Sequence, residues 1–494
     1  MKEIADITHF LNKPTTEDIE LITRAYEFAK KAHEGQFRKS GEPYFLHVAQ
    51  TGYYLAELGM SPTVISAGLL HDTVEDTEVT DKDIEREFGG EILCLVQAVT
   101  KLGTVKYKGV ERNVENLRKF FVSMAQDFRV LIIKLADRLH NVETLEHVRP
   151  DKQKRIALET LEIYAPLANR LSMGKLRGRL EDAAFPFAYP KEYENVKKRL
   201  AERKDIDEQH VDEFTKELRK KLALAHVIPL SMDYRIKHLY SLWKKLEKYS
   251  GDIHKVYDIV ALRIIVKSIE DCYQTLGVIH GTWKPLPGKI KDYIALPKSN
   301  GYQSLHTTVF TGTGGIVEVQ IRTEQMHIEA EYGVAAHFAY KEHIKLENAD
   351  LKKQYEWVEQ LRDTQGQIAN TDKFFSSLKM DFFQNRVFVF TPKGDVIDLP
   401  EQSTPVDFAY NVHSDVGNTA TGAKINGKFL ALDTKLKSGD ICEIVTAKNA
   451  HPNEKWLKFV KTSIARNRIN HYLRENSLSD KFGGFGKYIP FLKK

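Results

Sequence analysis

The chain has 494 residues, more than one ordinary hydrophobic core accommodates, so about three domains are expected. Its 73 basic and 68 acidic residues leave a formal net charge of +5, which permits anionic ligands or nucleic acid as partners without requiring them. The composition lacks the proline, glycine and serine excess of disordered chains, no apolar run is long enough to cross a membrane, and no secretory signal begins the sequence. We therefore expect a globular cytoplasmic protein.

The three cysteines, Cys94, Cys272 and Cys442, lie far apart and inside apolar stretches. Because no CxxC pair is present, the sequence argues against a structural zinc site and against a disulfide framework. We expect all three to be core residues.

Helical spacing of apolar residues dominates the chain as far as about residue 190. The predicted helices cover residues 19–32, 64–70, 92–99, 130–145 and 161–167, and a heavily charged helix over 193–224 follows them. Strand signals are scarce in this part, so the first domain is expected to be all-α.

From Asp233 the pattern changes to short β-branched runs separated by helical segments. The runs cover 256–266, 306–311 and 315–321, and a further helix is predicted over 324–340. This alternation predicts an α/β domain with a small mixed sheet.

A third pattern begins near Asn385, where RVFVFTPKGDVIDLP predicts a hairpin with a Lys-Gly turn. A short helix at 406–412, a second hairpin in GAKINGKFLALDTKL and the strand GDICEIVTA follow. A compact mixture of about 60 residues matches the β-grasp size class. A helix over 454–475 and a glycine-rich tail complete the chain.

The first candidate site lies where an apolar helical run ends in GLLHDTVEDT. Burying His71 and Asp72 beside leucines is costly unless something binds them, and Glu75 and Asp76 follow one turn later on the same face. Asp137 lies inside a second apolar helix, VLIIKLADRLHNV, where an ionised carboxylate needs a cation or a partner.

His47, in EPYFLHVAQ, completes a set of histidine and carboxylate ligands that suits manganese or a similar divalent ion better than zinc. Such an ion lowers the pKa of a bound water, and the neighbouring acid pair would accept the proton. The alternative is structural: a helix N-cap followed by a surface acidic stretch, with Asp137 paired to Arg138 or His140.

The turn QFRKSGEPY precedes this site and offers donors from Arg38, Lys39 and Ser40, which would hold a phosphate or a base. Asn141 follows Asp137 at the i+4 position, on the same helix face. An exposed basic loop is the alternative interpretation of the turn.

Basic side chains gather in the α/β domain around two acids, Asp258 in VYDIVALR and Glu318 in IVEVQIR. Strand alternation places Gln320 and Arg322 on the face of Glu318. The donors come from DYRIKHLYSLWKK, interpreted as helical, and from GKIKDYIALPKSNGYQSLH; they comprise Arg235, Lys237, His238, Ser241, Lys245, Lys289, Lys291 and Lys298, with Tyr302 as a stacking face.

Two acids that hold magnesium within a ring of bases that neutralise phosphates are what phosphoryl transfer needs. No GxxxxGK[ST] loop is present, which excludes a P-loop enzyme. A solvated basic face with two strand acids is the alternative.

Together and in this order, the motifs resemble one family, the bacterial Rel/SpoT-type synthetase–hydrolases of guanosine tetraphosphate and pentaphosphate. The similarity runs through residues 20–475. RKSGEPY, LLHDTVEDT, KLADRLHN and IYAPLANRL are similar to the hydrolase half, and YRIKHLYS, DIVALRIIV, KDYIALPKSNGYQSLHTT and EVQIRTEQMHIEAEYGVAAH to the synthetase half. The resemblance implies an HD-type hydrolase at 1–195, a nucleotidyltransferase-like synthetase at 196–345, a helical linker at 346–384, a TGS β-grasp domain at 385–447 and the start of a regulatory region at 448–494.

The family's roles carry over to the matching positions. In the hydrolase half they imply manganese ligands at His47, His71, Asp72 and Asp137, water activation by Glu75 and Asp76, and nucleotide contacts from Arg38, Lys39, Ser40, Asn141 and Thr144. In the synthetase half they imply magnesium binding and catalysis by Asp258 and Glu318, guanine stacking on Tyr302, and nucleotide contacts from Arg235, Lys237, Ser241, Lys245, Lys291, Lys298, His306 and Gln320.

The implied reactions are opposed: transfer of the β,γ-diphosphate of ATP to the 3′-hydroxyl of GDP or GTP with release of AMP, and hydrolysis of that 3′-diphosphate. KIKD resembles the basic RxKD form of two-activity relatives but begins with Lys289, which leaves the preference between GDP and GTP open. Simultaneous reactions would waste ATP, so we expect the halves to exchange activity through a conformational equilibrium.

The TGS resemblance implies contact with uncharged tRNA on the ribosome near His413, for which a locally satisfied turn histidine is the alternative. Longer relatives continue into Cys-rich and ACT-type modules, which we expect to be missing here. Two other functions stay open: a hydrolase-dominant enzyme with a weak synthetase half, and a tRNA- or ribosome-binding regulator with vestigial catalysis. No membrane partner is expected.

Overall fold

The computed structural model describes residues 2–103, 127–298, 300–311, 315–336 and 386–482. The chain divides into two compact units, Met1–Asp363 and Thr364–Lys494. The linker predicted at 346–384, the end of the helix predicted over 324–340 and the tail from residue 483 lie outside the described residues. In the described part of the chain, no helix combines the length and the apolar character that crossing a bilayer requires.

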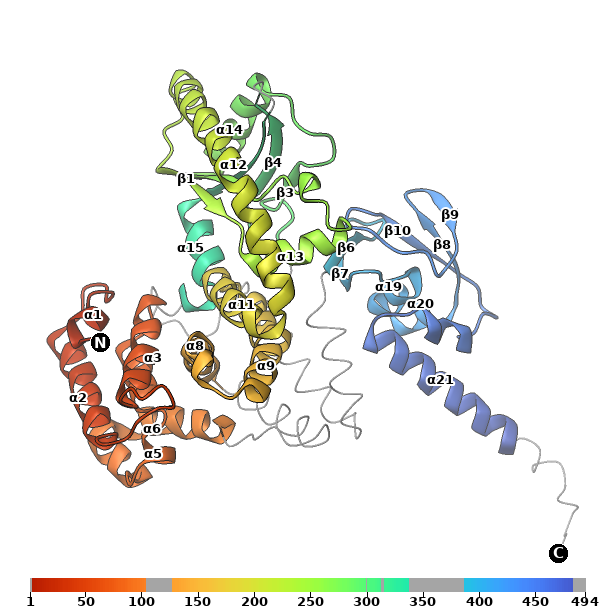
Figure 1. Ribbon diagram of the computed structural model, residues 1–494. Helices are drawn as coiled ribbons and strands as arrows, with labels where there is room; N and C mark the ends of the chain where they lie inside the picture. The colour runs from red at the N-terminus through yellow and green to blue at the C-terminus, as the bar shows by residue number, and fades with distance from the viewer. Residues whose placement is uncertain (1, 104–126, 299, 312–314, 337–385, 483–494) are drawn as a thin grey trace, which may run out of the picture. The chain divides into compact units, whose positions relative to one another are not determined.

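In the described residues of the first part of unit one, the regular elements are helices, as the sequence predicted (Figure 1). Its helices are α1 (Ile4–Thr8), α2 (Thr16–Ala32), α3 (Phe45–Glu57), α4 (Pro62–Leu70), α5 (Thr73–Asp76), α6 (Asp81–Gly103), α8 (Phe128–Glu143), α9 (Pro150–Glu159), α10 (Ala165–Arg170) and α11 (Gly174–Ala188), with a 3-10 turn at Leu145–His147 and a π-helical turn at Thr160–Tyr164. Their apolar faces are fully buried, as at Leu55, Leu69 and Ile132.

Two glycines allow α3 and α4 to pack closely. A Cβ at Gly52 of α3 would lie 2.7 Å from Leu69, and a Cβ at Gly68 of α4 would lie 2.1 Å from Leu55. A side chain at either position would force these buried leucines to move, so glycine allows the two helices to approach closely. This packing places the His47 segment opposite the end of α4.

The second part of unit one is an α/β domain around a five-stranded mixed sheet in the order β1-β2-β5-β4-β3. The strands are β1 (Ser231–Ile236), β2 (Val260–Val266), β3 (Lys291–Asp292), β4 (Leu305–Phe310) and β5 (Ile316–Thr323), and the helices are α12 (Pro190–Leu224), α13 (Leu239–Lys248), α14 (Ile269–Thr282) and α15 (Glu324–Tyr332). Strands β2 and β5 are parallel, and the other neighbours pair antiparallel.

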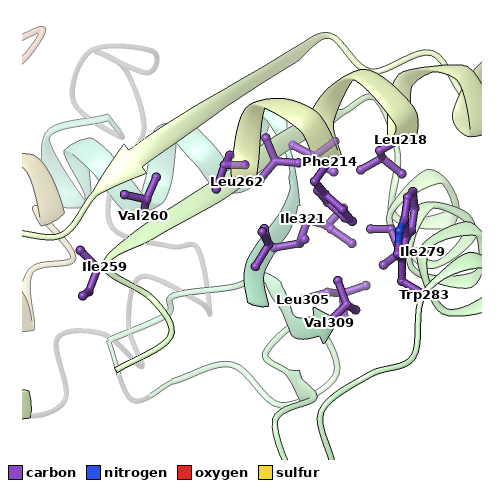
Figure 2. Close-up of a cluster of buried hydrophobic side chains, with 14 of the residues drawn as sticks. Phe214, Leu218, Ile259, Val260, Leu262, Ile279, Trp283, Leu305, Val309 and Ile321 are labelled. Atoms are coloured by element: carbon purple, nitrogen blue, oxygen red, sulfur yellow. The ribbon is translucent and has the colours of Figure 1, made fainter. Parts of the chain in front are cut away.

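Helix α12 supplies one wall of the core of this domain. Figure 2 shows Phe214 and Leu218 of α12 gathered with Ile279 of α14 and with Trp283, the residue after α14. The ring centres of Phe214 and Trp283 are 4.6 Å apart. Val196 of α12 belongs to the same buried cluster. The domain boundary predicted at 195/196 therefore falls inside a continuous helix.

The helical interpretation of DYRIKHLYSLWKK is wrong for its first part. Ser231–Ile236 pairs antiparallel with β2, from Ser231 opposite Ile265 to Ile236 opposite Val260. Pairing with a buried strand outweighs the helical spacing, and the helix begins only at Leu239.

Unit two contains the two predicted hairpins. Its elements are β6 (Arg386–Phe390), β7 (Val396–Pro400), α19 (Pro405–Val412), α20 (Ser414–Asn418), β8 (Ala420–Ile425), β9 (Lys428–Leu430), β10 (Cys442–Thr446), a 3-10 turn at Glu454–Lys458 and α21 (Ser463–Phe482). The Asn426-Gly427 turn has positive φ at both residues, which suits a tight hairpin.

Cys272 and Cys442 are buried, but Cys94 is exposed, against the prediction for that residue.

The single helix predicted over 454–475 is instead a 3-10 turn followed by α21, and the cause is a buried carboxylate. Asp407 of α19 is fully buried, and its Oδ1 accepts the backbone N–H of Lys461 at 2.8 Å and of Thr462 at 2.7 Å. Its Oδ2 accepts the N–H of Thr404 at 2.9 Å. These bonds hold residues 461–462 out of helical geometry and tie the β-grasp sheet to α21.

Replacing Asp407 with alanine would leave these buried N–H groups without an acceptor. We expect Asp407→Ala to lower the unfolding free energy of unit two by about 3 kcal/mol. Denaturant unfolding of the whole chain, followed by fluorescence of the buried Trp456, measures this change. The exposed Asp433→Ala is the control, and equal stability of the two variants would contradict the role of Asp407.

Candidate functional site

Three helical segments bring the predicted metal ligands of the first site together. His47 of α3, His71 at the end of α4 and Asp137 of α8 are buried, and one ligand atom from each lies within 4.8 Å of the others. His47 Nε2 is 3.2 Å from Asp137 Oδ1, and His71 Nε2 is 3.2 Å from Asp72 Oδ2. All four residues predicted from the sequence thus meet at one point.

The hydrogen bonds of the two histidines leave the right nitrogen for a metal. His71 Nδ1 lies 2.8 Å from the carbonyl of Gly68, to which it donates, while its Nε2 is buried and has no hydrogen-bond partner among the described residues. Metal-binding histidines characteristically donate from the other nitrogen in this way. The donor set of imidazole and carboxylate groups fits a divalent ion.

The tautomer of His47 follows from its neighbours. His47 Nδ1 and His140 Nδ1 are 2.8 Å apart, so one nitrogen must donate to the other. His140 Nδ1 is also 3.2 Å from the guanidinium of Arg38, which can only donate. His140 Nδ1 is therefore the acceptor, and the lone pair of His47 Nε2 faces Asp137. Burial, with His47 and Arg38 nearby, lowers the pKa of His140 to about 3, so this ring stays neutral.

Asp137 remains ionised in its apolar helix because Lys134 lies one turn earlier. Lys134 Nζ donates to Asp137 Oδ2 at 2.7 Å, and Asn141 Nδ2 donates to Oδ1 at 2.5 Å. Burial raises the pKa of Asp137, but the neighbouring positive charge, above all that of Lys134, holds the pKa well below the ordinary value. Of the two partners that the structural alternative offered Asp137, Arg138 forms its salt bridge with Glu159, and His140 contacts His47.

A cavity of about 210 Å³ opens in front of these groups. It is lined by Tyr44, His47, Asp72, Glu75, Asp76, Val99, Thr100, Lys134, Asp137 and Asn141. The Tyr44 hydroxyl lies 2.8 Å from an oxygen of Asp72 and of Asp76. Burial, together with those two carboxylates, raises the pKa of Glu75, which suits a group that accepts a proton.

Of the donors predicted to hold a nucleotide here, Arg38, Asn141 and Thr144 are brought together. The Arg38 guanidinium donates to Asn141 Oδ1 at 2.6 Å and to Thr144 Oγ1 at 3.0 Å. Ser40 instead donates to Glu42 at 3.2 Å, and Lys39 is exposed. The Arg38 turn is thus docked on α8, not a free basic loop.

The sequence motifs indicate no role in this site for Tyr44 or Lys134, and they indicate His140 only as a structural partner of Asp137. Lys134 was detectable, because it precedes Asp137 by three residues on one helix. Tyr44 and His140 lie in quoted motifs, but their partners come from other helices, so spacing alone could not reveal them.

The second site is built around Asp258, just before β2. Its Oδ2 accepts a hydrogen bond from Lys237 at 2.5 Å and another from Lys245, whereas its Oδ1 is buried without a partner in the described structure. Burial raises the pKa of Asp258, but the two lysines outweigh it and lower the pKa to about 2. The free oxygen of an ionised carboxylate fits a magnesium ion.

Glu318 of β5 lies at the end of a short polar chain. Tyr302 Oη is 2.9 Å from His306 Nε2, and His306 Nδ1 is 3.2 Å from Glu318 Oε1. Burial raises the pKa of Glu318, but the contact with His306 and the charge of Lys237 together hold it below the ordinary value. Gln320 also donates to Glu318, at 3.2 Å, as its place on the same strand face predicts.

Lys298 lies over two aromatic rings at this site. Its Nζ is 4.7 Å from the centre of the Tyr293 ring and 4.6 Å from that of Tyr302. The protein atoms packed around its ammonium group and the nearby Lys291 lower the pKa of Lys298 to about 8, although the residue as a whole is exposed. Arg235 is partly exposed on β1, and Lys291 is exposed on β3 beside His306.

Two predicted residues form hydrogen bonds outside the two sites. Ser241 Oγ donates to Glu181 of α11 at 3.0 Å, so its hydroxyl faces the helical domain. His413 in unit two accepts the N–H of Asp415 at 3.2 Å and caps α20, but its side chain is 66% exposed and still accessible to a partner.

Three family models match the chain in the order of its domains. They are described as HD domain (residues 25–174), region found in RelA / SpoT proteins (residues 234–345) and TGS domain (residues 387–446). A guanosine-3′,5′-bis(diphosphate) 3′-pyrophosphohydrolase of Aquifex aeolicus is 47% identical over 471 residues, covering 95% of this chain and 67% of that protein. The chain belongs to the RelA/SpoT family.

Two further members of the RelA/SpoT family carry other names. A GTP pyrophosphokinase of Myxococcus xanthus is 45% identical over 462 residues, 93% of this chain and 61% of that protein. The bifunctional (p)ppGpp synthase/hydrolase SpoT of Escherichia coli is 42% identical over 465 residues, 94% of this chain and 66% of that protein. The chain thus spans roughly two thirds of the length of these relatives.

The hydrogen bond between His47 and His140 predicts an effect on metal affinity. His140→Ala removes the acceptor that fixes the tautomer of His47, so we expect manganese to bind about tenfold more weakly. Calorimetric titration of the apoprotein with manganese measures this without any substrate. The control is His147→Ala, a partly exposed histidine just beyond the same helix. Unchanged affinity in the His140 variant would show that the tautomer assignment is wrong.

Proposed function

We propose that the chain carries two opposed activities: it transfers diphosphate from ATP to the 3′-hydroxyl of GDP or GTP, and it hydrolyses the 3′-diphosphate of the product. The observation that supports this best is that each site contains a buried polar atom that makes no hydrogen bond in the described structure: His71 Nε2, which faces the carboxylate of Asp72, in one and Asp258 Oδ1 in the other. Both atoms are of the kind that binds a divalent cation. Relatives are named for each activity.

In the proposed hydrolase, Arg38 and Asn141 hold the nucleotide at the mouth of the cavity. A manganese ion bound by the two histidines and two aspartates would lower the pKa of a water there. Glu75, whose pKa is raised, lies where it would accept a proton from such a water, and Tyr44 donates a hydrogen bond that orients Asp76.

In the proposed synthetase, Tyr302 stacks on guanine and the lysines around Asp258 neutralise the phosphates of ATP. A magnesium ion at Asp258 and Glu318 would neutralise charge that develops on the transferred diphosphate. Glu318, kept ionised by His306, accepts the proton of the attacking 3′-hydroxyl.

The two activities should be separable by single substitutions. We expect Glu318→Gln and Asp258→Asn to reduce formation of tetraphosphate from ATP and GDP by at least about 1,000-fold, because each removes a group used in the transition state. Both should retain hydrolysis, and Asp137→Asn should show the reverse pattern. Product formation with magnesium, and release of diphosphate from the tetraphosphate with manganese, are scored separately.

The same experiment distinguishes the alternatives. A hydrolase-dominant enzyme would form little tetraphosphate before any substitution, and a regulator with vestigial catalysis would show neither reaction. Either result with the unmodified, folded chain would contradict the two-way function.

We further propose that unit two binds uncharged tRNA through the exposed side of His413, which the match to the TGS family supports. Binding should weaken steeply as salt rises, because phosphate contacts release counterions. His413→Ala should lower the affinity, measured by fluorescence anisotropy of labelled tRNA, whereas the exposed His451→Ala should not.

Nucleotide substrates and the unpaired cysteines fit a cytoplasmic location.

A further inference from the structure

Helix α13 begins without a cap of its own. His238 occupies the N-cap position, yet its side chain makes no capping hydrogen bond, and the first turn contains no acidic residue. A ten-residue helix is marginal on its own, so its free N–H groups need an acceptor from elsewhere.

The acceptor comes from α11 in the helical domain. Asp182 Oδ1 accepts the backbone N–H of Tyr240 at 3.2 Å. Tyr240 is the second residue of α13, and this N–H is one that an N-cap side chain ordinarily satisfies. Asp182, which is distant in sequence, therefore acts as the N-cap acceptor that His238 does not provide.

Three further contacts fix the same junction. Asp182 Oδ2 is 2.7 Å from His238 Nδ1, and Glu181 accepts a hydrogen bond from Ser241. A Cβ at Gly178, one turn before Asp182, would lie 2.2 Å from His238 Nε2, so the imidazole rests directly on the backbone of α11. These contacts thus fix the position and the rotation of the first turn of α13 relative to α11.

The position of α13 matters because residues at its two ends contact Asp258 in the second site. Lys237 lies immediately before the cap, and Lys245 lies on the helix; both contact the same oxygen of Asp258. A small shift or fraying of the first turn of α13 would move both lysines relative to that carboxylate.

Apolar packing keeps the two helices in contact independently of Asp182. The ring of Phe185 on α11 stacks on Trp243 with centres 5.2 Å apart, and it meets Tyr240 edge-on at 5.4 Å. Phe185 is fully buried. Removing the Asp182 carboxylate should therefore disturb the first turn of α13 without separating the domains.

We propose that Asp182 is a positioning residue for the synthetase site: it caps α13 from the helical domain and so holds Lys237 and Lys245 against Asp258. This role rests on the proposed synthetase function. Neither the HD match, which ends at residue 174, nor the RelA / SpoT match, which begins at residue 234, includes Asp182.

The test compares Asp182→Ala, which removes the cap, with Asp182→Asn, which keeps an oxygen that accepts the Tyr240 N–H. Asparagine and aspartate are similar N-caps, whereas alanine is a poor one. We expect the alanine variant to lose about tenfold in synthetic kcat, with KM for ATP and GDP changed by less than about twofold, and the asparagine variant to regain most of the loss. Hydrolysis should stay unchanged, as in the exposed control Asp212→Ala, and thermal stability should fall only slightly, because a single N-cap is lost.

Hydrogen exchange of the α13 amides provides a readout that needs no catalysis. Exchange in the first turn should accelerate in the alanine variant and return towards the unmodified rate in the asparagine variant. If exchange or kcat is the same in the alanine variant as in the unmodified chain, the positioning role is overturned. A parallel fall of both activities and of stability would also overturn it, since that shows a general structural role. An unmodified chain that forms no tetraphosphate would contradict the proposed function instead, while the cap remains measurable by exchange.

Discussion

A carboxylate buried in an apolar environment must be neutralised, and both candidate sites of unit one are organised around that constraint. Asp137 is held ionised by Lys134 on its own helix, and Asp258 by Lys237 and Lys245. In each case the lysine occupies one oxygen, Oδ2, and the other oxygen faces the site. The lysines thus allow an anionic oxygen to stay buried where a divalent cation would bind.

Asp407 in unit two shows the contrasting solution. It is also buried, but backbone and hydroxyl donors from Thr404, Lys461 and Thr462 surround both of its oxygens. No oxygen is left for a ligand, so this carboxylate fastens two elements together. The same residue type in similar burial therefore separates into structural and site roles according to whether its oxygens are satisfied.

Helix α11 connects the surroundings of the two sites within unit one. Arg179 donates to Glu57 of α3 and to Glu143 of α8, each at 2.9 Å, and these are the helices that carry His47 and Asp137. Three residues later, Asp182 caps α13. One rigid helix thus contacts elements of both centres, and its orientation sets constraints on each.

The sequence by itself determined the domain types, the acids and most of the bases. Helical and strand periodicity are local properties, and a polar residue inside an apolar run, such as Asp137 or Asp258, is visible without coordinates. The sequence also sufficed to place His47 and His71 in one site, because the motifs resemble those of a known family.

Only the tertiary structure decided how those groups are held. That Asp258 takes lysines from both sides of a strand–helix junction, that His140 sets the tautomer of His47, and that Ser231–Ile236 is a strand all depend on partners distant in sequence. The same holds for Cys94, whose apolar neighbours do not reveal that its own side chain faces outward. Hydrogen bonds between separate elements produce no periodic pattern in the sequence. Residue spacing therefore predicts which residues are costly to bury, but not which partners offset the cost of burying them.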